Sequence, residues 1–301
     1  MLMLDVRRLR LLCDLSRLGT IAAVAQAHTY TPSAVSQQLS ALEREAGVAL
    51  LERTGRRVTF TTAGRILVQH AEVVLTALEQ TTAALAALAT GLSGPLRIGA
   101  FPTAVRTFLP AALVALGHRH PELELTVTEL DPVTVPDALR ERRLDVGLLH
   151  DYDVVPIEPD PVLDTVPLLD ETVFLAVPGT APAAEEAGPL REVRDAAWIM
   201  ASPGTLCHTV TLHVCRSAGF TPRARHHADD FAAVLALVAA GQGVSLVPQL
   251  AAAQPPAGVR LIPLSIRRRT HIAYRQGAAT HPAIAAFVSA IRASTGAFLG
   301  R

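Results

Sequence analysis

Short polar side chains recur on one face of a predicted helix near the amino end of the chain. Thr31 and Pro32 predict the start of this helix, because threonine is a good N-cap and proline suits the first helical turn. The polar face carries hydroxyls and amides and no carboxylate, so it can hydrogen-bond base edges and phosphates in a DNA groove. The residues that we expect to contact DNA here are Thr31, Ser33, Ser36, Gln37 and Ser40.

A basic turn follows this helix. Two short strands, near 50–51 and 58–60, are predicted to flank the segment 53–57, which contains Arg53, Arg56 and Arg57. Three arginines at a hairpin tip suit contacts with phosphates or the minor groove. Residues 1–65 carry nine arginines and five acidic residues, although the net charge of the chain is zero. This asymmetry indicates a basic DNA-binding head on an acidic body and disfavours the alternative of a merely solvated polar face.

The upstream sequence completes a helix-turn-helix. Apolar residues at 6, 9, 12 and 13 predict a first helix, Gly19 ends it, and Thr20 caps a short second helix over 21–27. The order of helix, short helix, polar-faced helix and basic hairpin resembles the winged helix-turn-helix of LysR-type transcriptional regulators. The residues that carry this resemblance are Gly19-Thr20-Ile21-Ala22-Ala23-Val24-Ala25, 31–42, Gly47-Val48 and 51–57.

Composition fits a multidomain globular protein. A chain of 301 residues should hold two or three domains with a well-buried core. Its three cysteines have no regular spacing, which argues against a disulfide framework. The apolar start of the chain is too short for a signal sequence, and polar residues interrupt every long apolar run. We therefore expect a cytoplasmic protein that does not contact a membrane.

A long helix is predicted to follow the basic hairpin. Thr62 can cap it, and the segment 91–95 should end it. Apolar residues alternate by four and three along it, which is the heptad pattern of a coiled coil. A lone helix of this length needs a partner, so we favour pairing with a second subunit over packing on its own chain. The seam consists of Leu67, Ala71, Val74, Leu78, Thr81, Leu85, Leu88 and Leu92, with Val74, Leu78, Leu85 and Leu88 as dimerisation residues.

The remaining sequence predicts an α/β fold. Strands at 96–100, 123–127 and 146–149 alternate with helices at 104–116 and 137–142, which is typical of buried parallel strands. A second set has strands near 172–177, 198–200, 223–226 and 244–247 and helices at 205–217 and 230–239. A strand at 270–274 and a helix at 282–297 close the chain, with crossovers near 161–166 and 263–268. This order resembles the two-lobed, periplasmic-binding-protein-like effector domain of LysR-type regulators.

The resemblance divides the chain into three parts. Residues 1–62 form the winged helix-turn-helix, 63–92 the linker and dimerisation helix, and 93–301 the effector-binding domain. Lobe one takes in about 93–163 and 268–301, and lobe two about 164–267.

A ligand in such a fold sits where strands end and helices begin. Two strand-to-helix turns, 100–103 and 201–205, offer free N–H groups and hydroxyls. The candidate effector-binding residues are Phe101, Thr103, His150, Ser202, Thr205, Phe231 and Pro248. Plain helix capping by Thr103, Ser202 and Thr205, and core roles for His150 and Phe231, are the alternatives. No arginine clamp is evident, which disfavours a multiply charged anion.

Other chemistries have weaker support in the sequence. Cys207 and Cys215 lie where peroxide-sensing members of the family carry a redox pair, but one intact helix would separate their Cα atoms by about 12 Å. A disulfide needs less than about 7 Å. His208, His213, His226 and His227 lack metal-ligand spacing, so we expect no metal and no cofactor. The two lobes alone would also fit a solute-binding protein or an enzyme, but the amino-terminal head argues against both.

We therefore expect a sequence-specific DNA-binding transcriptional regulator, not an enzyme, that is modulated by a small-molecule effector. A redox-sensing regulator that uses Cys207 and Cys215 is the alternative. The resemblance further implies a homodimer or homotetramer on double-stranded promoter DNA and a contact with RNA polymerase.

Overall fold

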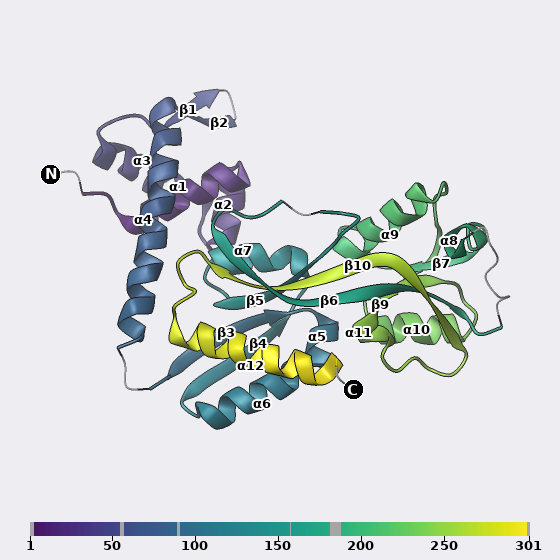
Figure 1. Ribbon diagram of the computed structural model, residues 1–301. Helices are drawn as coiled ribbons and strands as arrows, with labels where there is room; N and C mark the ends of the chain where they lie inside the picture. The colour runs from purple at the N-terminus through teal and green to yellow at the C-terminus, as the bar shows by residue number, and fades with distance from the viewer. Residues whose placement is uncertain (1–2, 55–56, 89–90, 157, 181–187, 300–301) are drawn as a thin grey trace. The chain divides into compact units, whose positions relative to one another are not determined.

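A computed structural model describes residues 3–54, 57–88, 91–156, 158–180 and 188–299 (Figure 1). The chain divides into two compact units, each of which is described by itself. The first unit contains Met1–Ala89 together with Arg275–His281. The second unit contains Thr90–Tyr274 together with Pro282–Arg301.

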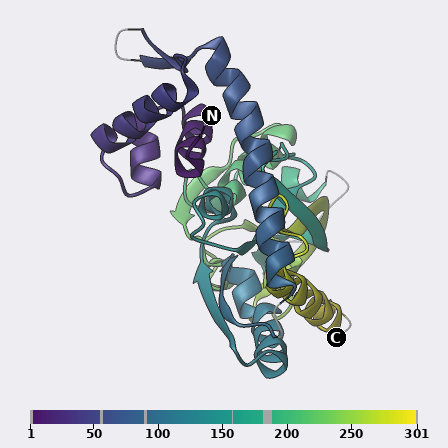
Figure 2. The same cartoon turned by 90° about the vertical axis from the view of Figure 1, so that its left-hand side faces the viewer.

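The first unit is a winged helix-turn-helix on a long helix, as predicted. Its elements are α1 (Val6–Leu18), α2 (Ile21–Ala27), α3 (Pro32–Ala46), β1 (Leu51–Thr54), β2 (Arg57–Phe60) and α4 (Thr62–Ala86). Side chains of Asp5, Thr20 and Thr31 cap α1, α2 and α3 by accepting backbone N–H groups. Gly47 ends α3 with φ of 70°, a conformation that glycine adopts at little cost. Figure 2 shows α1, α2, α3 and the hairpin at one end of α4.

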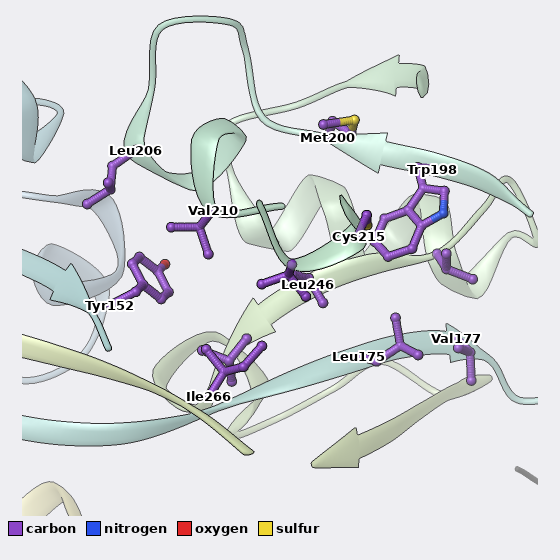
Figure 3. Close-up of a cluster of buried hydrophobic side chains, with 13 residues drawn as sticks. Tyr152, Leu175, Val177, Trp198, Met200, Leu206, Val210, Cys215, Leu246 and Ile266 are labelled. Atoms are coloured by element: carbon purple, nitrogen blue, oxygen red, sulfur yellow. The ribbon is translucent and has the colours of Figure 1, made fainter. Parts of the chain in front are cut away.

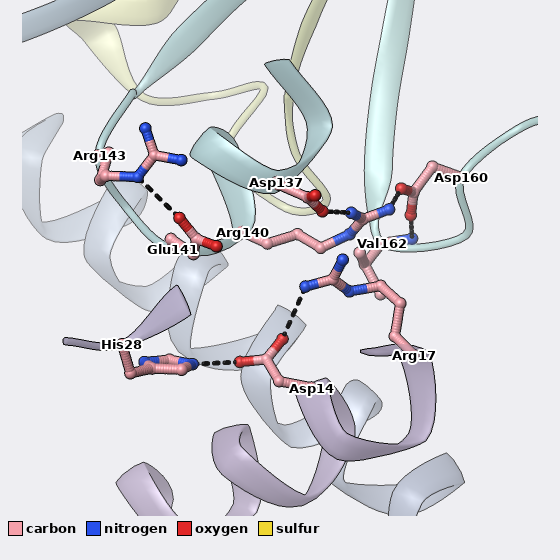
Figure 4. Close-up of polar contacts among 9 residues, drawn as sticks. All are labelled: Asp14, Arg17, His28, Asp137, Arg140, Glu141, Arg143, Asp160 and Val162. Carbon is pink, nitrogen blue, oxygen red and sulfur yellow. Dashed lines mark hydrogen bonds and ion pairs between the residues drawn. The ribbon is translucent and has the colours of Figure 1, made fainter. Parts of the chain in front are cut away.

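Apolar faces of the three short helices meet in a core that also takes in the start of α4. Leu12, Val24, Val35 and Leu42 are fully buried there. Polar contacts fix the helices around this core. Asp14 of α1 binds His28 Nε2 at 2.6 Å (Figure 4), which ties α1 to the end of α2.

The long helix departs from its prediction in three ways. Thr61, not Thr62, is the N-cap, since its hydroxyl accepts the Gly64 N–H. The helix ends at Ala86, so Leu88 and Leu92 of the predicted seam both lie outside it, and Gly91 opposes helix formation before Leu92. The amino-terminal part of the predicted seam packs inside its own unit, where Ala71 is 1% exposed.

The second unit is built on one six-stranded sheet with the order β4-β3-β5-β10-β6-β9. Strand β3 is parallel to β4 and β5, as predicted, whereas β10 is antiparallel to β5 and β9 is antiparallel to β6. A separate parallel pair, β7-β8, completes lobe two. The strands are β3 (Gly94–Ala100), β4 (Leu123–Glu129), β5 (Val146–Tyr152), β6 (Leu163–Pro178), β7 (Ala197–Met200), β8 (Arg223–His227), β9 (Ser245–Pro248) and β10 (Val259–Arg275).

The two predicted crossovers are parts of long strands. The segments 161–166 and 263–268 overlap β6 and β10, which run side by side along the unit (Figure 1). Their length lets one sheet serve both lobes, so residues of β10 reach the lobe junction. Helices cover the strands, and Figure 1 shows α6 and α12 on one side of lobe one.

These helices are α5 (Pro102–Arg106), α6 (Leu109–Arg119), the 3₁₀ turn η1 (Pro132–Thr134), α7 (Val135–Arg140), α8 (Pro189–Glu192), α9 (Leu206–Ser217), α10 (Phe231–Ala239), α11 (Gln249–Ala252) and α12 (Pro282–Leu299). The single helix predicted over 104–116 is in fact split into α5 and α6. Pro110 lies in the first turn of α6, where the ring cannot donate an N–H to a preceding helix.

Each lobe has its own core. In lobe two, Trp198, Leu175, Val210 and Cys215 are buried together between β6, β7 and α9 (Figure 3). In lobe one, Val135 and Leu139 of α7 pack on the sheet. Arg140 of the same helix pairs with Asp137 and Asp160 (Figure 4), which fastens α7 to the segment before β6.

Candidate functional site

The polar face of α3 lies exposed on the first unit. Gln37 and Ser40 are exposed, and Thr31 Oγ1 accepts the Ala34 N–H at 3.2 Å and lies 2.9 Å from the hydroxyl oxygen of Ser33. Ser36 is half-buried on the same helix. The predicted wing is only partly among the described residues. Arg56 lies outside them, and Arg53 in β1 and Arg57 in β2 are described by their backbone alone.

Contacts from α1 hold α3 in place. Arg8 of α1 donates from Nε to Gln38 Oε1 at 2.9 Å and forms an ion pair with Glu45. Both partners lie on α3, so α3 is fixed against α1 along its length. The exposed face with Gln37 is therefore carried on a rigid element, which is what base reading needs.

An apolar stripe is exposed on the carboxyl-terminal half of α4. Val74 is 43% exposed, Leu78 38%, Leu85 64% and Leu88 81%. At 100° per residue Val74, Leu78 and Leu85 share one face of the helix, and Leu88 follows in the turn after the helix ends at Ala86. Glu79 and Ala83, by contrast, are buried on another face of α4, where Glu79 forms an ion pair with Arg275. The stripe therefore corresponds to the dimerisation residues expected from the heptad pattern.

A cavity of about 220 Å³ opens at the junction of the two lobes of the second unit. A smaller recess of about 50 Å³ adjoins it, and Asp131, Thr205, Cys207, Asp229 and Phe231 line both. The cavity is lined by Phe101, Pro102, Thr103, Glu129, Leu130, Asp131, Pro132, His150, Thr205, Cys207, Asp229, Phe231 and Arg268.

A buried ion pair forms one wall of the cavity. Arg268 of β10 is 1% exposed and contacts Glu171 of β6 at 2.6 and 2.7 Å. The second oxygen of Glu171 accepts the Leu250 N–H at 2.7 Å. Arg268 Nη2 also donates to Thr103 Oγ1 at 3.2 Å, and its guanidinium lies 5.1 Å from the Phe101 ring centre. Burial alone would lower the pKa of Arg268, but Glu171, with smaller contributions from Tyr152 and Cys207, more than reverses this, and the pKa is raised.

Cys207 lies at the start of α9 and lines the cavity. Its sulfur is 3.6 Å from the Tyr152 hydroxyl (Figure 3 shows Tyr152 beside Leu206). Burial raises the pKa of the Cys207 thiol, Tyr152 and Arg268 act against this, and the carboxylates of Asp131 and Asp229 add to it. The thiol is therefore protonated near neutral pH.

Cys215 has a different environment. It lies on the same helix, α9, but its side chain is fully buried in the core of lobe two beside Trp198 (Figure 3). Burial raises its pKa to about 12. Because α9 is continuous from Leu206 to Ser217, the helical separation of about 12 Å between the two Cα atoms holds in the structure.

The structure brings five of the seven candidate effector residues together. Phe101, Thr103 and His150 come from lobe one, and Thr205 and Phe231 from lobe two. Ser202 and Pro248 are not among the lining residues. The Ser202 hydroxyl donates to Asp229 at 2.7 Å, and Pro248 is buried at the end of β9. Thr205 also caps α9 by accepting the His208 N–H, whereas Thr103 bonds Arg268 in place of a capping role.

Sequence reasoning missed Arg268, the acidic lining residues and the arrangement of Cys207 in the cavity. Arg268 had a detectable signal. In the alternating strand β10, Ile266, Arg268, Thr270 and Ile272 form the buried face. An arginine at an inward position of an otherwise apolar alternation indicates a buried charge that needs a partner.

Two further properties of the described residues concern membranes and metal ions. No helix in the described ranges is long and apolar enough to cross a membrane. Among these residues, no three His, Cys, Asp or Glu side chains come together as metal ligands.

Comparison with known families accounts for nearly the whole chain. Residues 6–65 match the family described as "Bacterial regulatory helix-turn-helix protein, lysR family", and residues 89–296 match the "LysR substrate binding domain". The chain belongs to the LysR family of bacterial regulators. This LysR-type chain is therefore a DNA-binding transcriptional regulator with a two-lobed α/β effector domain, which confirms the predicted family and fold.

Several similar proteins in the LysR family have names that refer to hydrogen peroxide. A probable hydrogen peroxide-inducible genes activator of Mycobacterium leprae is 34% identical over 236 residues, which cover 78% of this chain and 74% of the relative. The Escherichia coli K12 regulator OxyR is 30% identical over 279 residues, or 90% and 89% of the two chains. A hydrogen-peroxide-bound cysteine mutant of OxyR from Corynebacterium glutamicum has a TM-score of 0.60 at 25% identity, covering 98% and 94%.

Proposed function

We propose that this LysR-type regulator binds a two-fold promoter site as a homodimer or homotetramer and changes its contact with RNA polymerase when a small effector enters the junction cavity. The exposed stripe on α4 supports the dimer, because an apolar helix face of this length is stabilised by a partner. A two-fold protein requires a site with matching symmetry. Sequencing of the DNA recovered with the protein from cells would give this site.

Base reading is assigned to the exposed face of α3. Replacing Gln37 with Ala is expected to cost about 1–3 kcal/mol of binding free energy on the recovered site and little on random DNA, because an amide pair to a base edge is lost. Fluorescence anisotropy on both DNAs measures the difference.

Gln38→Ala is the matched control, because that amide already bonds Arg8 within the chain. An equal loss on both DNAs for Gln37→Ala would show that the residue positions the protein without reading bases.

Phosphate binding is assigned to the wing. Replacing both Arg53 and Arg56 with Ala should weaken binding to every DNA sequence. It should also flatten the dependence of log K on log salt by roughly one unit for each lost phosphate contact. Arg223→Ala removes an exposed arginine from β8 of the other unit and serves as the control. An unchanged salt slope in the double variant would refute the wing assignment.

The observation that supports effector binding is the convergence of both lobes on one cavity. Thr103 and His150 of lobe one face the same space as Thr205 and Phe231 of lobe two. A ligand that contacts both lobes has different affinities for two lobe arrangements, and this difference is what can shift the protein between DNA-bound states. Calorimetric binding to the full-length protein, followed by DNA footprinting with the same compound, tests it.

Peroxide sensing is the second candidate. It is favoured by the names of the relatives and by the Cys207 thiol in the cavity. In that reaction the thiolate attacks hydrogen peroxide and forms a sulfenic acid with release of hydroxide, and the Cys215 thiol then displaces water to give a disulfide. The first step is disfavoured because burial raises the pKa of Cys207 and keeps the thiol protonated. The second is disfavoured because the intact α9 holds the two Cα atoms about 12 Å apart.

We therefore expect that micromolar peroxide will leave the Cys207–Cys215 disulfide unformed over minutes. Alkylation of free thiols followed by mass spectrometry of the α9 peptide measures this, and Cys13, whose pKa burial raises to about 12, is the internal control. Rapid formation of the disulfide would make peroxide sensing the function of this site.

A further inference from the structure

The mouth of the junction cavity is acidic. Glu129 at the end of β4, Asp131 before η1 and Asp229 before α10 all line it. Asp131 and Asp229 also act together on the Cys207 thiol, whose pKa both raise. These carboxylates come from both lobes, so their charges converge on the space between them.

The positive charge in the wall is already neutralised. Arg268 is the one lysine or arginine among the described lining residues, and it is in contact with Glu171, which is fully buried. The pair as a whole contributes no net charge to the cavity. An anionic ligand would therefore meet uncompensated carboxylates, whereas a cation would be attracted to them.

A buried histidine lines the same cavity. His150 is 4% exposed and lines the cavity, and its Nδ1 atom has no hydrogen-bond partner within the described ranges. Burial, together with the nearby positive charge of Arg268, lowers the pKa of His150 well below its ordinary value, so the ring is neutral. A neutral imidazole has one donor and one acceptor nitrogen, and leaving Nδ1 unpaired in a buried site is unfavourable in either tautomer.

Aromatic side chains complete the lining. Phe231 faces both recesses, and the Phe101 ring lies against His150 with the two centres 4.9 Å apart. Aromatic faces and carboxylates together are the surroundings that bind organic ammonium groups. A bare metal ion does not suit this cavity, since no three metal-ligating side chains of the described chain come together.

We propose that the junction cavity binds an organic cation: an ammonium group held by Asp131 and Asp229, on a small apolar body that contacts Phe231. This inference rests on the proposed function and specifies its ligand class. It predicts that the cavity binds cations more tightly than anions of the same shape, because the carboxylates repel anions.

The test uses three probes of similar shape and different charge on the full-length protein. These are 2-phenylethylamine, 2-phenylethanol and 3-phenylpropanoate, titrated calorimetrically near neutral pH. We expect the amine to bind about tenfold or more tightly than the alcohol, a difference of about 1.4 kcal/mol, and the carboxylate to bind most weakly. Tighter binding of the carboxylate would overturn the proposal.

Variants of the carboxylates locate the effect. Asp131→Asn keeps the acceptor oxygen that the Val133 N–H uses, and Asp229→Asn keeps the one that the Ser202 N–H uses. The amide nitrogen of Asn at 229 can in turn donate to the Ser202 hydroxyl, which donates to the second carboxylate oxygen in the wild type. Each should reduce amine affinity about tenfold and leave alcohol affinity unchanged. Asp195→Asn, whose side chain is 91% exposed on lobe two, removes the same charge outside the cavity and should have no effect. Unchanged amine affinity in both cavity variants would also overturn the proposal.

The outcomes separate this inference from the proposed function. If the carboxylate or the alcohol binds best and changes the DNA footprint, the cavity is an effector site for another ligand class and only the inference fails. If none of the three probes binds, the inference about the ligand class is contradicted, whereas the effector role of the cavity is not.

Discussion

Arg268→Met is expected to lower the free energy of unfolding of the effector unit by about 3–5 kcal/mol, because Glu171 is left as an unpaired charge in the interior. Glu171 is fully buried and depends on Arg268 and the Leu250 N–H for its hydrogen bonds. Denaturant unfolding followed by the fluorescence of Trp198 measures the change. This residue is the one tryptophan of the chain and is buried in lobe two.

A double variant is the matched control for this effect. Arg268→Met combined with Glu171→Leu removes both charges and should recover much of the lost stability, since no buried charge is left without a partner. The Leu250 N–H still loses its acceptor, so recovery should stop short of the wild type. A single variant within 1 kcal/mol of the wild type would mean that water reaches Glu171 and that the pair is not a sealed wall of the cavity.

Leu85→Glu is expected to split the proposed dimer and to reduce affinity for the proposed two-fold DNA site by about 100-fold or more. Leu85 belongs to the exposed stripe near the carboxyl end of α4, and a carboxylate there would be desolvated in a pair of α4 helices joined along this stripe. Loss of the second reading head removes the gain from simultaneous binding of two half-sites. Light scattering gives the oligomeric state, and anisotropy with full and half sites gives the affinity.

Gln69→Glu adds the same charge to an exposed position on another face of α4 and should leave both measurements unchanged. If the Leu85 variant stays dimeric, the subunits meet through another surface. In that case the stripe does not have the role that its heptad pattern indicates.

Local signals in the sequence were sufficient for the DNA-binding unit. Caps at Thr20 and Thr31 and the glycine at 47 define helices through contacts a few residues apart, and the structure has these helices where they were expected. Helix ends set by weaker preferences were less accurate, as Leu92 shows. The sequence could not indicate that Ala71 packs on its own unit, because the same heptad pattern serves contacts within and between chains.

The cavity depends on contacts between distant parts of the chain. Arg268 reaches it because β10 pairs with β5 in the register that places Arg268 opposite Tyr152 and Thr270 opposite His150. A shift of one residue would turn Arg268 to the other face of the sheet. The partner of Arg268 is Glu171, 97 residues away. Periodicity identifies which positions face inward but not which of them meet.

The most direct test of effector control is one footprinting series on the recovered promoter site. The full-length protein is measured alone, with 2-phenylethylamine and with hydrogen peroxide, and the series is repeated for Asp131→Asn. The account predicts that the amine changes the protected region or the affinity of the wild type, that the variant loses this response, and that peroxide changes neither. A footprint that responds to peroxide and not to the amine would contradict it and would transfer the sensing role to the Cys207 thiol.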